Sequence, residues 1–146
     1  MTPIRIKKLN DNAIIPTYGT EFSAGADLYA LPGEAITIEP HKTVMIHTGL
    51  AMEIPEGYAG LIFARSGLAS KRGLAPANKV GVVDPDYRGE FMVALHKHPA
   101  EVRTVEGGER VAQLVIVPFI QAAFEIAEEL SDTVRGEGGF GSTGKK

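Results

Sequence analysis

Apolar and polar side chains alternate in several short stretches of the chain, which begin at Ile4, Ile36, Val44, Leu61 and Phe91. Successive side chains of a β-strand point to opposite faces, so an alternation with a period of two predicts strands. Turn sequences such as LPG and DPD separate these stretches. Many short strands with frequent turns predict an all-β domain, either a β-sandwich or a small barrel.

One short helix is predicted over residues 66–72. Ser66 suits the N-cap position, and Lys71 and Arg72 place positive charge in the last turn, where the helix dipole favours it. Gly73 can take the left-handed conformation that ends a helix. The helix would thus interrupt the run of strands only briefly.

Residues 120–130 fit two different structures. Ile120, Phe124 and Ala127 recur at helical spacing in a stretch rich in Ala and Glu. Phe124 and Ile126 also alternate with their neighbours as they would in a strand. The pattern slightly favours a helix and leaves both structures open.

The composition changes after Leu130, where residues 131–146 contain five glycines and one large apolar residue, Phe140. Such a segment cannot bury enough surface to order itself. The sequence therefore divides into a β-domain, residues 1–130, and a flexible Gly-rich C-terminal tail, residues 131–146. The tail is either a frayed end or a segment that closes over a ligand.

The end of the tail nearly matches the P-loop pattern G-x-x-x-x-G-K-[ST] over residues 139–145. Lys146 stands where Ser or Thr is required, and no strand precedes the match, so it is no P-loop NTPase site. Its glycine amides and hydroxyls, together with the guanidinium of Arg135, still suit a phosphate.

Composition excludes several classes of protein. The chain of 146 residues has the size of one domain and a formal net charge of −3, which argues against coating duplex nucleic acid. It has no cysteine, which rules out disulfides and thiol catalysis. Its longest apolar stretch, residues 114–120, is too short to span a membrane, and its N-terminus does not resemble a signal peptide. We expect a cytoplasmic protein.

Polar residues that could bind or cleave a phosphate ester stand within apolar or turn segments. Arg65 and Ser66 lie at the start of the predicted helix, where free N–H groups attract anions. Residues 78–91 are predicted as a β-hairpin, with Asp84 and Tyr87 in its turn. Taken alone, Arg65 and Ser66 are more typical of an ordinary helix cap with a surface arginine, and the Asp-Pro-Asp sequence is normal for a solvated turn. His96 and His98 would share a strand face, and surface histidines are favoured over a metal site.

In this order, five segments resemble the motifs of the trimeric dUTP pyrophosphatase (dUTPase) family: AGADLYA at 24–30, ARSGLAS at 64–70, GVVDPDYRGE at 81–90, GERVAQL at 108–114 and RGEGGFGSTG at 135–144. The resemblance implies a jelly-roll subunit in a homotrimer with three shared active sites. One chain would supply the hairpin, a second the segments around Asp27, Arg65 and Gln113, and a third the tail. It also implies a strand, not a helix, over residues 120–130.

The resemblance further implies that the protein hydrolyses dUTP to dUMP and pyrophosphate, which lowers dUTP and supplies dUMP for dTMP synthesis. Water would attack the α-phosphorus, and Asp84 would orient and deprotonate that water and contact the sugar 3′-OH. Mg²⁺ would be held by the triphosphate. Asp27 would contact the metal through water.

The remaining residues are expected to bind the substrate. Tyr87 would pack on the deoxyribose and reject UTP, and Phe140 would stack over the uracil. The uracil edge would be read by Asn78 and the backbone at Val82 and Val83, with Met92 close by. The phosphates would be held by Arg65, Ser66, Gly67 and Gln113, and enclosed by Arg135, Gly141, Ser142 and Thr143.

Two alternatives belong to other classes. A dCTP deaminase of the same fold needs a Glu after the hairpin, and residues 91–96 contain no acid. A regulatory module that only binds a nucleotide would not need the water-directing Asp84. Both alternatives are therefore weaker than a dUTPase.

Overall fold

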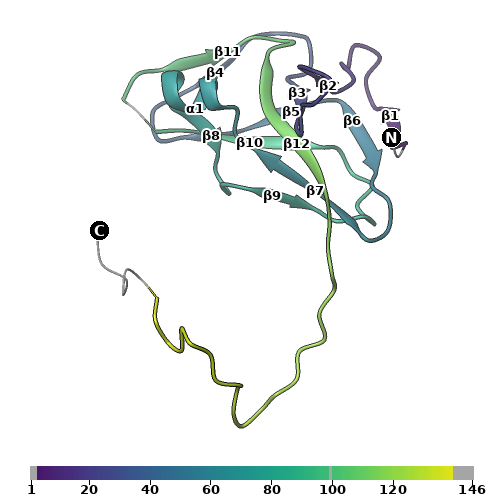
Figure 1. The fold of residues 1–146 in the computed structure, drawn as a ribbon. Helices are drawn as coiled ribbons and strands as arrows, with labels where there is room; N and C mark the ends of the chain where they lie inside the picture. The colour runs from purple at the N-terminus through teal and green to yellow at the C-terminus, as the bar shows by residue number, and fades with distance from the viewer. Residues whose placement is uncertain (1–2, 99, 140–146) are drawn as a thin grey trace.

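The computed structural model describes residues 3–98 and 100–139 and consists mainly of antiparallel strands (Figure 1). The largest sheet has five strands in the order β2-β3-β12-β7-β9. Its strands are β2 (Thr17–Tyr18), β3 (Ala26–Tyr29), β12 (Arg110–Pro118), β7 (Tyr58–Phe63) and β9 (Gly81–Val83). The prediction of an all-β, jelly-roll-like domain with one short helix is confirmed.

Three smaller sheets complete the domain. One has the order β5-β10-β8, and the other two are the pairs β1-β6 and β4-β11. Their strands are β5 (Thr43–His47), β10 (Met92–Lys97), β8 (Leu74–Pro76), β1 (Arg5–Lys8), β6 (Leu50–Glu53), β4 (Ile36–Ile38) and β11 (Arg103–Val105). All of the pairs are antiparallel. Strands joined by short turns thus alternate between the sheets.

The alternation of side chains along β10 fixes which face of this strand meets the core. Phe91, just before the strand, and Val93 and Leu95 within it are almost fully buried, while the residues between them are partly exposed. They join side chains from the other sheets in one hydrophobic cluster. Burying each such side chain contributes about 1.5–3 kcal/mol before the entropy cost of ordering it.

The helix α1 (Ser66–Arg72) is where the sequence predicts it, but its N-cap residue is Arg65 and not Ser66. Arg65 has extended backbone angles, so Ser66 already lies in the first turn. Gly73 ends the helix with a φ of 62°, as predicted. In the part of the chain that the structure describes, no helix is long and apolar enough to cross a membrane.

Residues 78–91 are not the hairpin that the sequence predicts. Strand β9 pairs with β7, whereas β10 pairs with β5 and β8. Both edges of β10 are therefore occupied, and β9 must find its partner in the other sheet. Residues 84–91 form an irregular connection that crosses from the five-stranded sheet to β10, and we call residues 84–91 the crossing segment.

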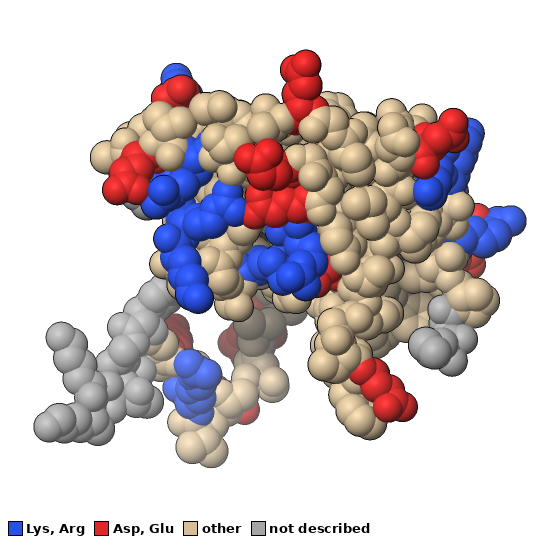
Figure 2. Space-filling model, turned by 90° about the horizontal axis from the view of Figure 1, so that it is seen from above, with Lys and Arg blue, Asp and Glu red and all other residues tan. Residues whose placement is uncertain are grey.

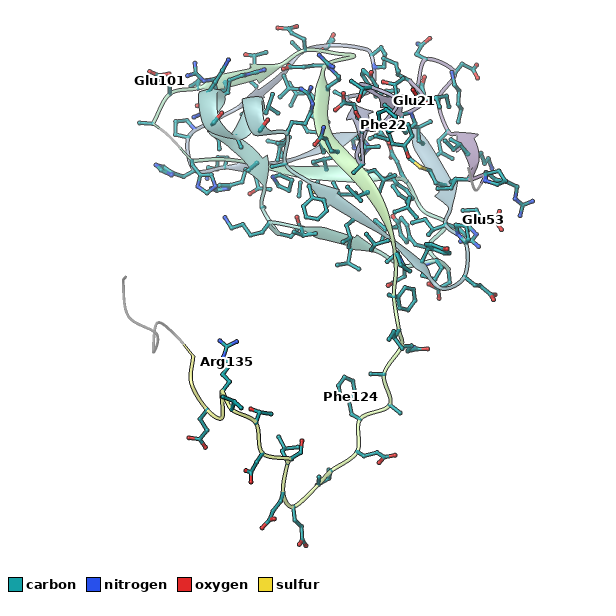
Figure 3. The ribbon with its side chains drawn as sticks, in the orientation of Figure 1. Glu21, Phe22, Glu53, Glu101, Phe124 and Arg135 are labelled. Carbon is teal, nitrogen blue, oxygen red and sulfur yellow. The ribbon has the colours of Figure 1, made fainter. Side chains whose placement is uncertain are left out.

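The predicted strand over residues 120–130 is also wrong for the single chain. After β12, residues 119–139 contain no strand or helix and run away from the sheets (Figure 1). We call residues 119–139 the arm. A strand needs a partner edge, and both edges of β12 are already paired with β3 and β7. The arm leaves Phe124 97% and Ile126 105% exposed, and Figure 3 shows Phe124 and Arg135 well away from the sheets.

Candidate active site

Asp27 lies at the centre of a group of polar side chains contributed by three neighbouring elements. In the register of the sheet, Asp27 of β3 stands opposite Gln113 of β12, and Arg65 follows directly after β7. Asp27 Oδ1 accepts hydrogen bonds from Arg65 Nε at 2.8 Å and from Gln113 Nε2 at 3.4 Å. Asp27 Oδ2 accepts one from Arg110 Nη1 at 3.3 Å. We call these four residues the Asp27 cluster.

The Asp27 cluster brings together three residues that the sequence singled out, and it adds Arg110. The Asp27 residue is 4% exposed, and its carboxyl group faces two guanidinium groups. A buried carboxylate paired in this way fixes the directions of the donors around it. Arg110 was missed because nothing in its spacing separates it from other surface arginines.

The Asp27 cluster does not present Asp27 as a direct metal ligand. Both of its oxygens already accept hydrogen bonds from cationic or amide donors, and a cation approaching them would meet two positive charges. Among the described residues, no group of three or more His, Asp or Glu side chains could hold a metal ion. The contact of Asp27 with Mg²⁺ through water stays a prediction.

The face of the molecule on which α1, β11 and the start of β12 lie carries many charged side chains. Figure 2 shows Lys and Arg side chains gathered on one side of this view, next to Asp and Glu side chains. In this region Arg72 forms an ion pair with Glu109 and donates to the carbonyl of Thr104, which ties α1 to β11 and β12. Ser66 and Gly67 are exposed at the start of α1.

A second group of predicted residues lines a pocket of about 240 Å³ between β9 and the crossing segment. These residues come from the segment predicted to bind the nucleoside, and the pocket contains all six of them: Asn78, Val82, Val83, Asp84, Tyr87 and Met92. The sequence missed Met45, Ile62, Glu90 and Phe91, which line it too. We call this cavity the nucleoside pocket.

The ring of Tyr87 lies over the backbone of the crossing segment. Its hydroxyl donates a hydrogen bond of 3.0 Å to the carbonyl of Glu90. A Cβ atom at Gly89 would lie only 2.4 Å from that hydroxyl, so the ring needs a glycine beneath it. The guanidinium of Arg88 donates to the carbonyls of Pro85 and Tyr87 and closes the turn.

A larger pocket of about 770 Å³ lies on the other side of the turn. Among the described residues that were predicted for the site, it contains only Asp84. Its charged lining includes Arg5 and Arg88, both of which pair with Glu53. Asp84 is exposed and borders both pockets, so solvent can reach its carboxylate.

In one chain, the Asp27 cluster and the nucleoside pocket have no residue in common. None of the four cluster residues lines the nucleoside pocket or the larger pocket beside it. Arg135 lies on the arm, where it donates a hydrogen bond to the carbonyl of Gly138. The predicted residues Phe140, Gly141, Ser142 and Thr143 lie outside the described residues.

Comparison with known proteins identifies the family to which this chain belongs. The dUTPase family model matches residues 11–144. The deoxyuridine 5′-triphosphate nucleotidohydrolase of Nautilia profundicola is 50% identical over 142 residues, which cover 97% of this chain and 99% of the relative. That of Hahella chejuensis is 45% identical over 141 residues, or 96% of this chain and 93% of the relative.

A solved structure supports the same family. The dUTPase of Staphylococcus bacteriophage 80alpha, as a G164S mutant with dUpNHpp, superposes with a TM-score of 0.89 at 31% identity and covers 99% of both chains. The fold and the relatives define a jelly-roll nucleotidohydrolase. The chain belongs to the dUTPase family and hydrolyses dUTP to dUMP and pyrophosphate. The relatives are nucleotidohydrolases, and neither the deaminase nor the binding module is supported.

Proposed function

We propose that each active site of this dUTPase is shared between chains of a homotrimer. The nucleoside pocket of one chain binds the deoxyuridine, and the Asp27 cluster of a second chain, with Ser66 and Gly67, binds the triphosphate. The tail, residues 131–146, of a third chain closes the site. The observation that carries this proposal is that none of the residues of the Asp27 cluster lines the nucleoside pocket of the same chain.

In the nucleoside pocket, Asn78 and the backbone at Val82 and Val83 read the uracil edge, with Met92 beside them. Tyr87 packs on the deoxyribose and leaves no space for a 2′-OH, which excludes UTP. The common position of these side chains in one pocket supports the assignment. A bound substrate that lacks a matching polar group covers the donors and acceptors of the pocket without pairing them, which makes its rejection strong.

Asp84 acts as the general base. Its carboxylate takes a proton from the attacking water, the water oxygen forms a bond to the α-phosphorus, and the bond to the bridging oxygen breaks so that pyrophosphate leaves with the electron pair. Asp84 also contacts the sugar 3′-OH. The exposed position of Asp84 at the rim of the nucleoside pocket supports these roles.

Arg65, Ser66, Gly67 and Gln113 hold the phosphates, while Arg135, Gly141, Ser142 and Thr143 enclose them from the tail and Phe140 stacks over the uracil. Asp27 orients Arg65 and Gln113 for this task. A Mg²⁺ ion bound to the triphosphate would take its oxygen ligands from the phosphates and from water, with Asp27 in contact with that water, and would neutralise charge on the leaving pyrophosphate. The reaction takes place in the cytoplasm and supplies dUMP for dTMP synthesis.

The trimer is supported by the arm and by an apolar groove. The arm carries apolar side chains that the single chain leaves in water, among them Ile120 at 93% exposure. A groove of about 400 Å³ lies between β1 and β2, lined by apolar residues that include Ile6, Tyr18 and Ile116. Strands β1 and β2 each have only one paired edge in the described chain. We propose that residues 119–130 of the arm of a neighbouring chain, the docking stretch, fill this groove.

Mixing two inactive variants tests the shared site. Asp84→Asn disables the part of the site formed by the nucleoside pocket, and Arg65→Ala disables the part formed by the Asp27 cluster. A trimer made of either variant alone should lose most dUTP hydrolysis. After both are unfolded and refolded together in equal amounts, about a quarter of the sites combine two intact halves, and activity should recover to about that fraction.

The control is each variant refolded alone. Asp84→Asn should also keep its affinity for the non-hydrolysable analogue dUpNHpp. A mixture as inactive as its parts would place the whole site in one chain, and full turnover in Asp84→Asn would remove Asp84 as the base.

A further inference from the structure

The Tyr87 ring depends on the backbone of residues 89–91 for its position. Its hydroxyl bonds to the Glu90 carbonyl, and its ring atoms would lie 2.4–2.9 Å from a Cβ atom on Gly89. The ring centroid lies 6.1 Å from that of Phe91. Any movement of this backbone would therefore move the ring at the nucleoside pocket.

The Glu90 carboxylate fastens that backbone to the turn between β5 and β6. Glu90 Oε1 accepts a hydrogen bond of 2.7 Å from the amide of Gly49, and Oε2 lies 2.8 Å from His47 Nδ1. The turn also holds the next residue, since Thr48 Oγ1 donates to the Phe91 carbonyl at 2.6 Å and the Phe91 amide donates to Leu50. Glu90 thus adds a side-chain anchor beside two backbone ones.

Glu90 remains ionised in this position. Burial works to raise its pKa, but the hydrogen bonds from His47 and from the Gly49 amide outweigh burial and hold the pKa below its usual value. An ionised carboxylate offers two acceptor oxygens and no donor, which suits two N–H groups arriving from different residues. A glutamine would keep one acceptor and turn its NH₂ group towards the other donor.

We propose that Glu90 is a positioning residue for sugar selection: by anchoring the backbone under Tyr87 to the β5–β6 turn, it holds the ring where a 2′-OH would clash. This inference rests on the proposed role of Tyr87. Glu90 itself need not touch the substrate. Glu90 affects the ratio of kcat/KM for dUTP to that for UTP more than it affects kcat/KM for dUTP alone. The reason is that the general base, Asp84, lies at the other end of the crossing segment, and the phosphate-binding residues lie on other elements.

The test compares kcat/KM for dUTP and for UTP in Glu90→Ala, Glu90→Gln and the wild type, with Mg²⁺ present. Glu90→Ala should lower the dUTP-to-UTP ratio about tenfold, because a small displacement of a positioning group has effects of this size or larger. Glu90→Gln keeps one hydrogen bond and should recover part of the ratio. Glu53→Ala is the matched control, since it removes another carboxylate paired to the crossing segment and should leave the ratio unchanged.

Tyr87→Ala separates the two proposals. A fall in the ratio for Tyr87→Ala together with unchanged ratios for both Glu90 variants overturns the role of Glu90 and leaves that of Tyr87 intact. An unchanged ratio for Tyr87→Ala overturns the proposed role of Tyr87. If Glu90→Ala does not fold, as judged by its melting temperature and size, Glu90→Gln decides: a wild-type ratio in that folded variant overturns the proposal.

Discussion

The crossing segment and the arm are both irregular stretches, yet they differ in how their groups are paired. In the crossing segment, Arg88, Glu90 and Phe91 form hydrogen bonds within the chain. In the arm, apolar side chains such as Phe124 remain in water. The Phe119 amide at its start donates to the Gly57 carbonyl, and the other hydrogen bonds of the arm lie in a turn at residues 133–138. One chain therefore completes the first region, whereas the second is the region that we propose another chain completes.

The largest effect should come from removing most of the tail. Deletion of residues 135–146 should leave the trimer intact and lower kcat/KM for dUTP by about a thousandfold, because groups that enclose the phosphates are lost. Size-exclusion chromatography and a pyrophosphate-release assay measure both quantities. Unchanged hydrolysis would mean that the tail does not take part in the site.

A smaller effect is expected from the apolar side chains of the arm. Phe124→Ser combined with Ile126→Ser should weaken the trimer about a hundredfold in its dissociation constant, since each side chain contributes about 1.5 kcal/mol or more when buried. Sedimentation over a range of concentrations measures the change. Val134→Ser, beyond the proposed docking stretch, is the control and should have no effect; an equally stable double variant would contradict docking.

In the crossing segment, Gly89→Ala should displace the ring of Tyr87 and lower kcat/KM for dUTP about tenfold. The ring is 42% exposed and can swing outward, so the melting temperature should change little. Gly33→Ala serves as a control, because a Cβ atom there meets nothing within 4 Å. Wild-type kinetics in Gly89→Ala would show that the position of the ring is unimportant.

The smallest effect concerns pH. The folded-state pKa of Glu90 lies below that of the unfolded chain, about 4.3, so the His47–Glu90 contact adds stability above that pH and loses it as the pH falls through the folded-state pKa. The free energy of unfolding should exceed that of Glu90→Gln by about 1 kcal/mol at pH 7. Urea titrations at several pH values should show this difference shrinking below about pH 4, and a constant difference would contradict an ionic contribution.

Local patterns predicted local structure well. The alternation at residues 91–96 gave the buried face of β10, and Gly73 gave the end of α1. The pairing of β9 was wrong because the choice of partner depends on which edges are free in the folded domain. The strand at residues 120–130 was wrong for the single chain, because the arm runs away from the sheets and pairs with none of their free edges (Figure 1).

The sequence predicted those residues of the candidate site that belong to recognisable motifs. It missed those residues whose role depends only on their neighbours in the fold. All six residues predicted for the nucleoside are in one pocket, and Arg65 and Gln113 meet at Asp27. Arg110 and Glu90 were missed because a charged residue gains such a role only through its neighbours in space. No sequence spacing connects Glu90 to Gly49, which lies in another turn.

The exposed arm also has a consequence for the life of a newly made chain. The sheets of one chain can form before a neighbouring chain is present. The apolar arm then stays exposed to proteases and to unintended partners. Capture of the arm is a collision between molecules, so its rate rises with concentration. Proteolysis would remove unassembled chains before assembled ones. The amount of enzyme would then depend on the fraction of chains that assemble as well as on the rate of synthesis.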